Sequence, residues 1–187
     1  MNDNTIKIIE ALLFASPEPL TQKIINIIFD ESPPNLEECI TILSKKFETD
    51  DHAIMVLNIA GGYQLRTKPE YDLYVRRLLN KTGQLKLSQA ALETLSIIAY
   101  KQPISRTDIE AIRGVDCAGV LKTLLKKVLI GIKGREEGPG RPLMYRTTDE
   151  FLESFGLSRL AELPKLKEIS EILNEQPALT QQIDAFK

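Results

Sequence analysis

The stretch SIIAYKQPISRTDIEAI, residues 96–112, has a counterpart earlier in the chain, LLFASPEPLTQKIINII, residues 12–28. Pro19-Leu20-Thr21 aligns with Pro103-Ile104-Ser105, an offset of 84 residues (103 − 19 = 84). The same offset pairs three further residues with identical ones: Ala15 with Ala99, Ile25 with Ile109, and Ile28 with Ile112. The fold of one stretch is therefore expected to recur in the other.

A second match follows in the same order. RTKPEY, residues 66–71, resembles RTTDEF, residues 146–151, at an offset of 80 (146 − 66 = 80). Two matches at nearly the same spacing indicate two copies of one unit of roughly 80 residues, and repeats of this size are tandem domains rather than a solenoid.

The first copy is expected to begin with three helices. Apolar residues at helical spacing predict a helix that ends at Pro17–Pro19. Thr21 is a suitable cap for a second helix. Asn35, followed by Glu38, resembles a capping box and begins a third. The apolar stripe of this third helix is Leu36, Cys39, Ile40, Leu43 and Phe47.

A hairpin and a closing helix are expected to complete the first copy. AIMVLNIAGGYQLRT, residues 53–67, is typical of a strand, a Gly-Gly turn and a second strand. Pro69 suits the first turn of a helix. We expect that helix to turn inward Tyr71, Tyr74, Val75 and Leu78.

The second copy repeats this order. Ser88, Ser105 and Asp116 are the predicted caps of its three helices, and Gly114 is the predicted stop of the second. The third helix is expected to bury Val120, Leu121, Leu124, Leu125 and Val128. LIGIKGR and LMYRTT are predicted strands, and Asp149 begins a predicted closing helix.

Three helices, a hairpin and a final helix make a winged helix, whose second and third helices form a helix-turn-helix. The predicted fold class is thus mostly α with small β-hairpins (α+β), as two tandem winged-helix domains at 1–82 and 83–157. Residues 158–187 are a predicted amphipathic helix, with Leu163, Leu166, Ile169, Ile172 and Leu173 on one side, and a flexible tail.

The glycine-rich run GREEGPGRP, residues 134–142, is interpreted as the wing of the second copy. Gly supplies positive φ and Pro stiffens a loop between paired strands. A phosphate-binding loop would open a helix and carry Lys-Ser/Thr, whereas these glycines lead into a strand.

Composition limits the function classes. The 187 residues carry a formal net charge of −2, so the chain lacks the cationic surplus of a strong DNA binder. Cys39, Cys117 and His52 have no metal-ligand spacing, and no nucleophile and base can be paired. We expect no catalysis, cofactor or metal, no membrane segment, and reduced thiols in the cytoplasm.

The run ETLSIIAYKQPISRTDIEAIRG, residues 93–114, resembles the segregation and condensation protein B family, as do VDCAGVLKTLLKKVLI, GRE, GPGRP, YRTTDEF and FGL after it. The first copy resembles the family through EALLFASPEPLT and GGYQLRTKPEY. Cys117 departs from the small hydroxyl residue expected there.

The resemblance implies a non-catalytic homodimer of tandem winged-helix subunits. Such proteins bind the central part of a kleisin subunit (segregation and condensation protein A), which bridges the ATPase heads of an SMC complex. That complex condenses and segregates bacterial chromosomes, so the implied location is cytoplasmic and nucleoid-associated.

Two candidate surfaces are predicted. The helices IKIIEALLF and QKIINIIF carry more apolar residues than one small domain needs to bury, so the first domain is the predicted dimerisation unit. Its predicted interface residues are Ile6, Ile9, Leu13, Ile24 and Ile28. The second domain is the predicted kleisin-binding unit, through a stiff wing and nearby apolar residues. These residues are Tyr100, Arg135, Arg141, Leu143 and Tyr145.

Two alternatives stay open. One is a tandem winged-helix transcription regulator that binds DNA directly, and the other is an enzyme that uses the glycine-rich loop. Lys122, Lys126 and Lys127 on the predicted recognition helix can hold phosphates but distinguish bases poorly, so we expect weak non-specific DNA binding at most.

Overall fold

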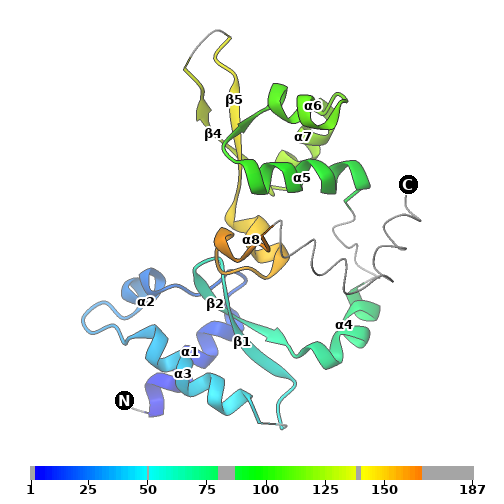
Figure 1. The fold of residues 1–187 in the computed structure, drawn as a ribbon. Helices are drawn as coiled ribbons and strands as arrows, with labels where there is room; N and C mark the ends of the chain where they lie inside the picture. The colour runs from blue at the N-terminus through cyan, green and yellow to red at the C-terminus, as the bar shows by residue number, and fades with distance from the viewer. Residues whose placement is uncertain (1–2, 50, 80–86, 138–139, 166–187) are drawn as a thin grey trace.

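The computed structural model describes residues 3–49, 51–79, 87–137 and 140–165. They form two units, a first unit of residues 3–79 and a second of residues 87–165, each with its own apolar core (Figure 1). The predicted boundary between residues 82 and 83 lies outside the described residues. Leu160 and Leu163, which follow the predicted end of the second domain at residue 157, pack against its core.

The first unit forms the elements that its sequence predicts. They are α1 (Asp3–Ala15), α2 (Gln22–Ile28), α3 (Leu36–Phe47), β1 (Ile54–Ile59), β2 (Gly62–Thr67), the 3-10 helix η1 (Pro69–Tyr71) and α4 (Asp72–Leu79). Thr21 accepts a hydrogen bond from the Ile24 N–H, and Asn35 accepts one from the Glu38 N–H. Both helices therefore begin at the expected caps.

The second unit repeats this order with one added strand. Its elements are α5 (Gln89–Lys101), β3 (Ile104–Ser105), α6 (Arg106–Arg113), α7 (Ala118–Lys126), β4 (Ile130–Arg135), β5 (Leu143–Thr147), α8 (Asp149–Phe155) and the 3-10 helix η2 (Leu160–Glu162). Ser88 and Ser105 cap α5 and α6 as predicted, and Gly114 ends α6 at φ +73°. The prediction of two α+β winged-helix units is confirmed.

The repeat extends to the strand pairing. Leu20 forms a bridge with Tyr63 in the first unit, and Ile104 pairs with Tyr145 in the second. Leu20 and Ile104 are equivalent positions of the repeat. The short strand β3, which the sequence analysis did not predict, thus corresponds to a single bridge in the first unit.

The turn of the first hairpin lies one residue earlier than predicted. Ile59 pairs with Gly62, so the two turn residues are Ala60 (φ 49°) and Gly61 (φ 73°) rather than two glycines. Gly62 has a different role, because a Cβ there would lie 2.9 Å from the Cβ of Pro19. The second glycine thus permits the close approach of the chain before α2.

Three residues predicted to be buried are exposed. Tyr74 and Leu78 of α4 are 68% and 71% exposed, because α4 buries none of its residues. Val128 is 58% exposed, since it takes φ 59° in the turn after α7, and Leu129 and Ile130 enter the core instead.

The two units meet through the turn of the first hairpin (Figure 1). The Ala60 N–H donates to the Leu157 carbonyl (2.9 Å) and the Gly61 N–H donates to the Ser158 carbonyl (3.1 Å). Glu18 and Glu153 face the space between the units, and burial, followed by the charges of Glu150 and Glu18, raises the pKa of Glu153. This contact is therefore made by main-chain groups beside acidic side chains.

Candidate partner-binding surfaces

The wing of the second unit is an exposed hairpin. Arg135 ends β4, and its guanidinium Nη1 donates to the Arg141 carbonyl (3.1 Å) across the loop. The Glu136 N–H donates to the Pro142 carbonyl (3.0 Å). Arg141 is exposed and held at φ 39°. The structure thus presents an arginine from a braced loop, as the sequence predicts for a wing.

The apolar residues assigned to this surface divide between core and surface. Leu143 is half-buried and packs against the second core. Tyr145, named as a kleisin-binding residue, is 8% exposed and belongs to that core, so its side chain offers little surface to a partner. Its main chain pairs with Ile104 of β3, so this edge of β5 is occupied within the unit.

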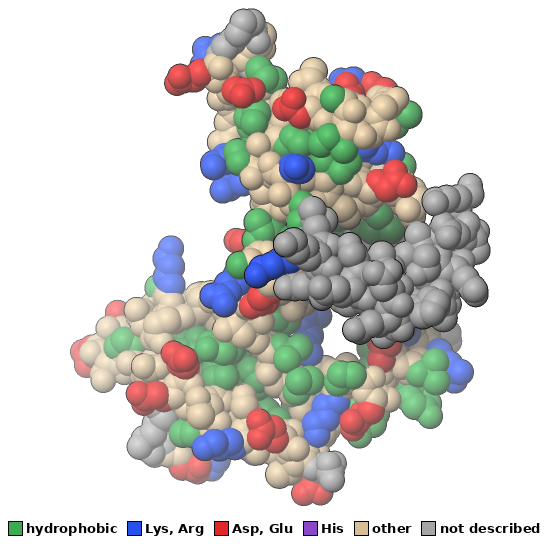
Figure 2. All heavy atoms as spheres, viewed as in Figure 1, with side chains coloured by type: hydrophobic (Ala, Val, Ile, Leu, Met, Phe, Trp, Pro, Cys, Tyr) green, Lys and Arg blue, Asp and Glu red, His purple; other side chains and the backbone are tan. Residues whose placement is uncertain are grey.

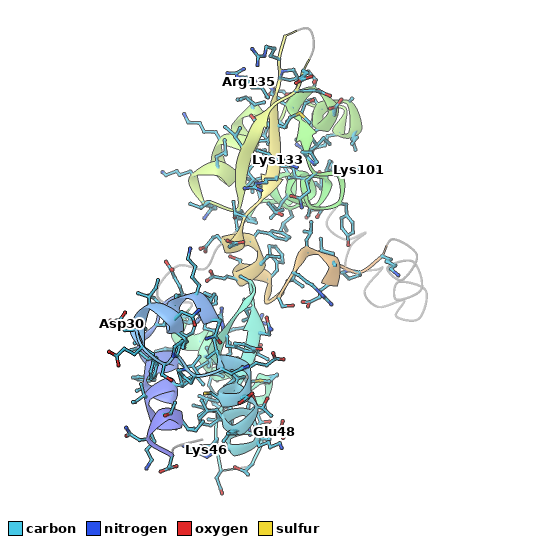
Figure 3. The ribbon with its side chains drawn as sticks, turned by 90° about the vertical axis from the view of Figure 1, so that its left-hand side faces the viewer. Asp30, Lys46, Glu48, Lys101, Lys133 and Arg135 are labelled. Atoms are coloured by element: carbon cyan, nitrogen blue, oxygen red, sulfur yellow. The ribbon has the colours of Figure 1, made fainter. Side chains whose placement is uncertain are left out.

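Tyr100 belongs to a different surface from the wing. Its hydroxyl donates to the Pro164 carbonyl (2.7 Å), and its side chain lines a groove with residues 160–165. Figure 3 shows Arg135 on the wing and Lys101, the neighbour of Tyr100, at the end of α5. Among the described contacts none joins Tyr100 to Arg135 or Arg141, so the five predicted residues do not form one site.

The predicted dimer-interface residues fall into two groups, one buried and one partly exposed. Ile9 and Leu13 are 0% and 2% exposed in the first core, which removes them from any surface between two copies of this fold. Ile6 and Ile24 are half-buried against that core, and Ile28 is 48% exposed.

The most exposed apolar residues of these helices were missed. Phe14 of α1 is 85% exposed and Ile27 of α2 is 71% exposed. The only sequence signal was the excess of apolar residues in these two helices. Which of them face outward follows from the packing of α1 against α3.

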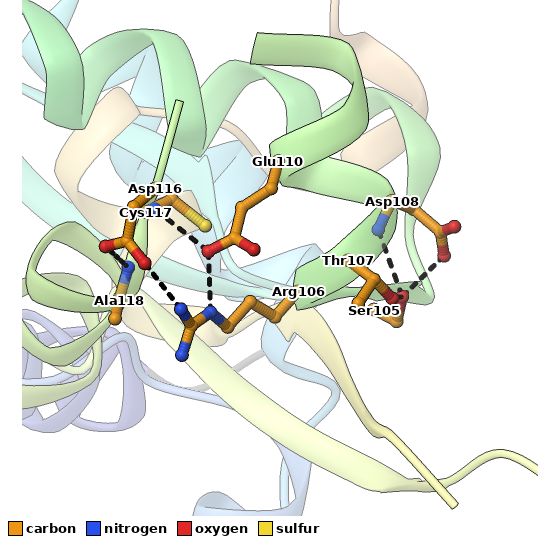
Figure 4. A network of polar contacts seen from close by, with 8 residues as sticks. All are labelled: Ser105, Arg106, Thr107, Asp108, Glu110, Asp116, Cys117 and Ala118. Carbon is orange, nitrogen blue, oxygen red and sulfur yellow. Dashed lines mark hydrogen bonds and ion pairs between the residues drawn. The ribbon is translucent and has the colours of Figure 1, made fainter. Parts of the chain in front are cut away.

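A polar network ties α6 to the start of α7 within the helix-turn-helix (Figure 4). The guanidinium of Arg106 binds Glu110 (2.6 Å) and Asp116 (2.5 Å), and Glu110 also accepts from the Cys117 N–H (3.1 Å). The hydrogen bond from Arg106 is the main cause that lowers the pKa of Glu110. The predicted cap of α7 lies one residue too early, because the N-cap position is Cys117, whose side chain makes no capping hydrogen bond. Asp116 nevertheless accepts from the Ala118 N–H (3.1 Å).

The third helix of each unit, the position of a recognition helix, carries an unsuitable set of side chains for reading DNA. The exposed start of α3 holds Glu37 and Glu38, which repel phosphate, and α7 exposes Lys122 and Lys126. Neither of these two described helices contains Arg, Asn or Gln. Figure 2 shows Lys and Arg scattered among Asp and Glu on the face in view.

The part of the chain that the structure describes holds no group of three or more His, Cys, Asp or Glu that could bind a metal ion. Burial raises the pKa of the Cys39 and Cys117 thiols, which disfavours the reactive thiolate. No described helix has the length and apolarity needed to cross a membrane.

Comparisons with solved structures identify two ScpB proteins. ScpB from Mycobacterium tuberculosis is 29% identical, over 84% of this chain and 98% of that one, with a TM-score of 0.39. A dimer of the ScpB N-terminal domain complexed with an ScpA peptide is 28% identical, over 40% of this chain and 94% of that one, with a TM-score of 0.36.

Comparisons with known sequences give longer and stronger matches. Segregation and condensation protein B of Syntrophotalea carbinolica is 45% identical over 178 residues, 95% of this chain and 90% of that protein. The protein of the same name from Clostridium tetani is 46% identical over 169 residues, 90% of this chain and 89% of that protein. The family model of segregation and condensation complex subunit ScpB matches residues 7–166. The chain therefore belongs to the ScpB family.

Proposed function

We propose that the chain is a non-catalytic accessory subunit of a bacterial chromosome-condensation complex. It binds the kleisin subunit that bridges the SMC ATPase heads, and it acts at the nucleoid in the cytoplasm. The observation that carries the proposal is the family match across residues 7–166, which includes both winged-helix units. Third helices that lack Arg, Asn and Gln support protein binding over DNA binding.

The wing of the second unit is the proposed kleisin contact. Arg141 offers a planar fork to a carboxylate or carbonyl, and the bond from Arg135 to its carbonyl restrains the loop before binding. Leu143, half-buried at the start of β5, supplies adjacent apolar surface.

Calorimetry with a purified kleisin fragment tests this contact. Arg141→Ala is expected to weaken binding by ~1–2 kcal/mol without a change in Tm, because an exposed wing residue is outside the core. Lys133→Ala is the matched control, since Lys133 is an exposed cation on β4 of the same wing. Equal affinities for the wild type and Arg141→Ala would show that the wing is only a turn, while loss of binding in the control alone would move the contact along β4.

The first unit is the proposed dimerisation unit. Phe14, Ile27 and Ile28 are exposed apolar residues of α1 and α2, and a stable interface removes at least ~1,000 Å² from solvent. The ScpB N-terminal domain solved with an ScpA peptide is itself a dimer.

Sedimentation of the full chain tests the dimer. Phe14→Ser is expected to shift the equilibrium to monomer, whereas Val115→Ser, at an exposed apolar residue of the second unit, should leave it unchanged. A wild-type monomer at high concentration contradicts the dimer, and an unaffected Phe14→Ser dimer places its interface elsewhere.

The alternative of a DNA-binding regulator makes a different prediction. Titration with duplex DNA at physiological salt should give weak binding that falls steeply as salt rises. Sequence-specific binding with Kd near ~10⁻⁸ M or tighter would favour the regulator.

A further inference from the structure

A pocket lies between α5 and α6 of the second unit, two helices that contact each other (Figure 1). Its volume is about 580 Å³. Leu92, Glu93 and Ile97 of α5 line it together with Ile112 and Arg113 of α6. The described residues of the wing line no part of it, so the pocket is separate from the proposed kleisin contact.

Arg113 is a buried cation with few partners. Its side chain is 8% exposed, and its Nε–H has no hydrogen-bond acceptor among the described residues. A guanidinium carries several N–H donors, and burying a charged group without partners is costly. Arg113 therefore has donors left over for an anionic group that enters the pocket.

Glu93 satisfies this arginine only in part. Its Oε2 lies 3.2 Å from the Arg113 Nη2, while its Oε1 accepts from the Gln89 amide (3.3 Å). Bonds between a guanidinium and a carboxylate are usually about 2.7–2.9 Å long, so the bond to Arg113 is a long one. The Glu93 side chain is also 50% exposed and is free to turn toward solvent. A carboxylate that replaced it would bind Nε and Nη2 together, in the two-bond geometry that arginine favours.

Apolar side chains flank the arginine on both helices. Leu92 of α5 is 41% exposed and Ile112 of α6 is 54% exposed. Ile97 is half-buried and packs against the second core, so it gives the pocket a fixed wall. A partner that carries a carboxylate beside aliphatic side chains matches both the charge and the apolar surface of the pocket.

We propose that this pocket binds an acidic side chain of a partner protein, presented between aliphatic residues. The partner's carboxylate takes the place of Glu93 on the Nε and Nη2 of Arg113, and the aliphatic neighbours cover Leu92 and Ile112. Glu93 holds the arginine while the pocket is free and turns toward solvent when the partner binds. The pocket is thus a second protein-binding site, and it does not depend on the contact proposed at the wing.

An NMR titration of the full chain tests the pocket, with the Arg113 Nε–H and the methyl groups of Leu92 and Ile112 as reporters. The probe is the peptide N-acetyl-Leu-Glu-Leu-amide, and its matched control has Gln in place of Glu. The Glu peptide is expected to shift all three reporters. The Gln peptide should bind about tenfold more weakly, because it lacks the charge that strengthens hydrogen bonds to a guanidinium.

Two variants separate the charged part of the pocket from the apolar part. Arg113→Lys should weaken binding of the Glu peptide about tenfold, because an ammonium does not form two parallel bonds to one carboxylate. Ile112→Ser should weaken it about fivefold through lost apolar contact. Val115→Ser is the matched control, since Val115 lies outside the pocket and is 53% exposed, and it should keep the wild-type affinity. Ile112 is exposed, so its result stands even where Arg113→Lys lowers the Tm.

The proposal fails on any of three results. Equal affinity for the Glu and Gln peptides means that the carboxylate is not recognised. Shifts of the same size with sodium acetate alone mean that the pocket holds a simple anion and not a protein segment. Shifts confined to the wing, with the Arg113 signal unmoved, assign the peptide to the other surface.

Discussion

The closing helices of the two winged-helix units differ in what they bury. In the second unit, α8 places Phe151 in the core at 3% exposure. In the first, α4 buries nothing and leaves Leu73, Tyr74, Leu78 and Leu79 between 51% and 71% exposed. The same order of elements can thus give one unit with a completed core and another with apolar surface left for a partner.

The two hairpins also differ in whether they contact the rest of the molecule. The turn of the first, Ala60-Gly61, contacts the second unit, whereas the wing of the second is free and carries Arg135 and Arg141. One hairpin of the repeat therefore joins the two units, and the other stays exposed for binding a partner.

The largest expected effect tests whether each core supports its own unit. Ile25 and Ile109 are equivalent and both 0% exposed, so Ile25→Ala and Ile109→Ala should each cost ~2–5 kcal/mol through a cavity. Urea denaturation followed by exchange-labelled peptides assigns each loss to its unit. The matched controls are Ile42→Ala in the first unit and Ile112→Ala in the second, at exposed apolar positions, which should cost less than ~0.5 kcal/mol. A destabilised first unit in Ile109→Ala would show that the two cores are coupled.

A smaller effect separates two glycines of the hairpins. Gly62→Ala should cost ~1–3 kcal/mol, because its Cβ would meet Pro19 Cβ at 2.9 Å and the Leu20 carbonyl oxygen at 3.0 Å. Gly131→Ala meets only the Thr148 Cγ2 at 3.4 Å and should be tolerated. Chemical denaturation of both variants gives the comparison, and equal stabilities would contradict the close approach at Gly62.

Replacing the N-cap residues of α2 and α6 should give a smaller difference in stability. Thr21 and Ser105 are equivalent, and replacing a cap by Ala costs ~0.5–2 kcal/mol. Ser105→Ala should lie at the upper end of that range, since the buried hydroxyl bonds the Asp108 N–H (3.2 Å) and the Asp108 carboxylate (2.6 Å). Thr21 makes one longer bond to the Ile24 N–H (3.4 Å) and should lie at the lower end. Thermal melting of the two variants ranks them, and the reverse order would reject this reasoning.

The smallest effect is an acid sensitivity of the second unit. Arg106 lowers the pKa of folded Glu110, so its stabilisation is present above the ordinary glutamate pKa and is lost as the pH falls through the lowered value. Glu110→Gln should reduce the slope of Tm against pH in the acid range, while Glu137→Gln, at an exposed glutamate of the wing, serves as the control. Parallel slopes for the wild type and Glu110→Gln would assign the acid sensitivity to other carboxylates.

The buried face of a helix could be predicted from the sequence where the apolar residues lie on one face. Leu36, Cys39, Ile40, Leu43 and Phe47 are all buried as predicted, because the other face of α3 is polar apart from Ile42, which favours one orientation. In α1 the apolar residues occupy several faces, so periodicity did not decide between burying Leu13 and burying Phe14. That choice depends on α3, which packs on α1 from more than 20 residues away along the chain.

The candidate site was less predictable for a related reason. Leu143 and Tyr145 alternate with Met144 on a strand, and nothing in the strand itself shows that β3 pairs beside Tyr145. The groove at Tyr100 is formed with residues 160–165, whose sequence has no period that would indicate packing against α5.

The joint between the two units has a consequence for protein engineering. Ala60 and Gly61 contribute amide groups to it, and Leu157 and Ser158 contribute carbonyls. These two hydrogen bonds between main-chain groups depend on the shape of the turn more than on which side chains stand there. First units of other family members, with different residues in their hairpin turns, should therefore be interchangeable in chimaeric proteins, provided that the two-residue turn is kept.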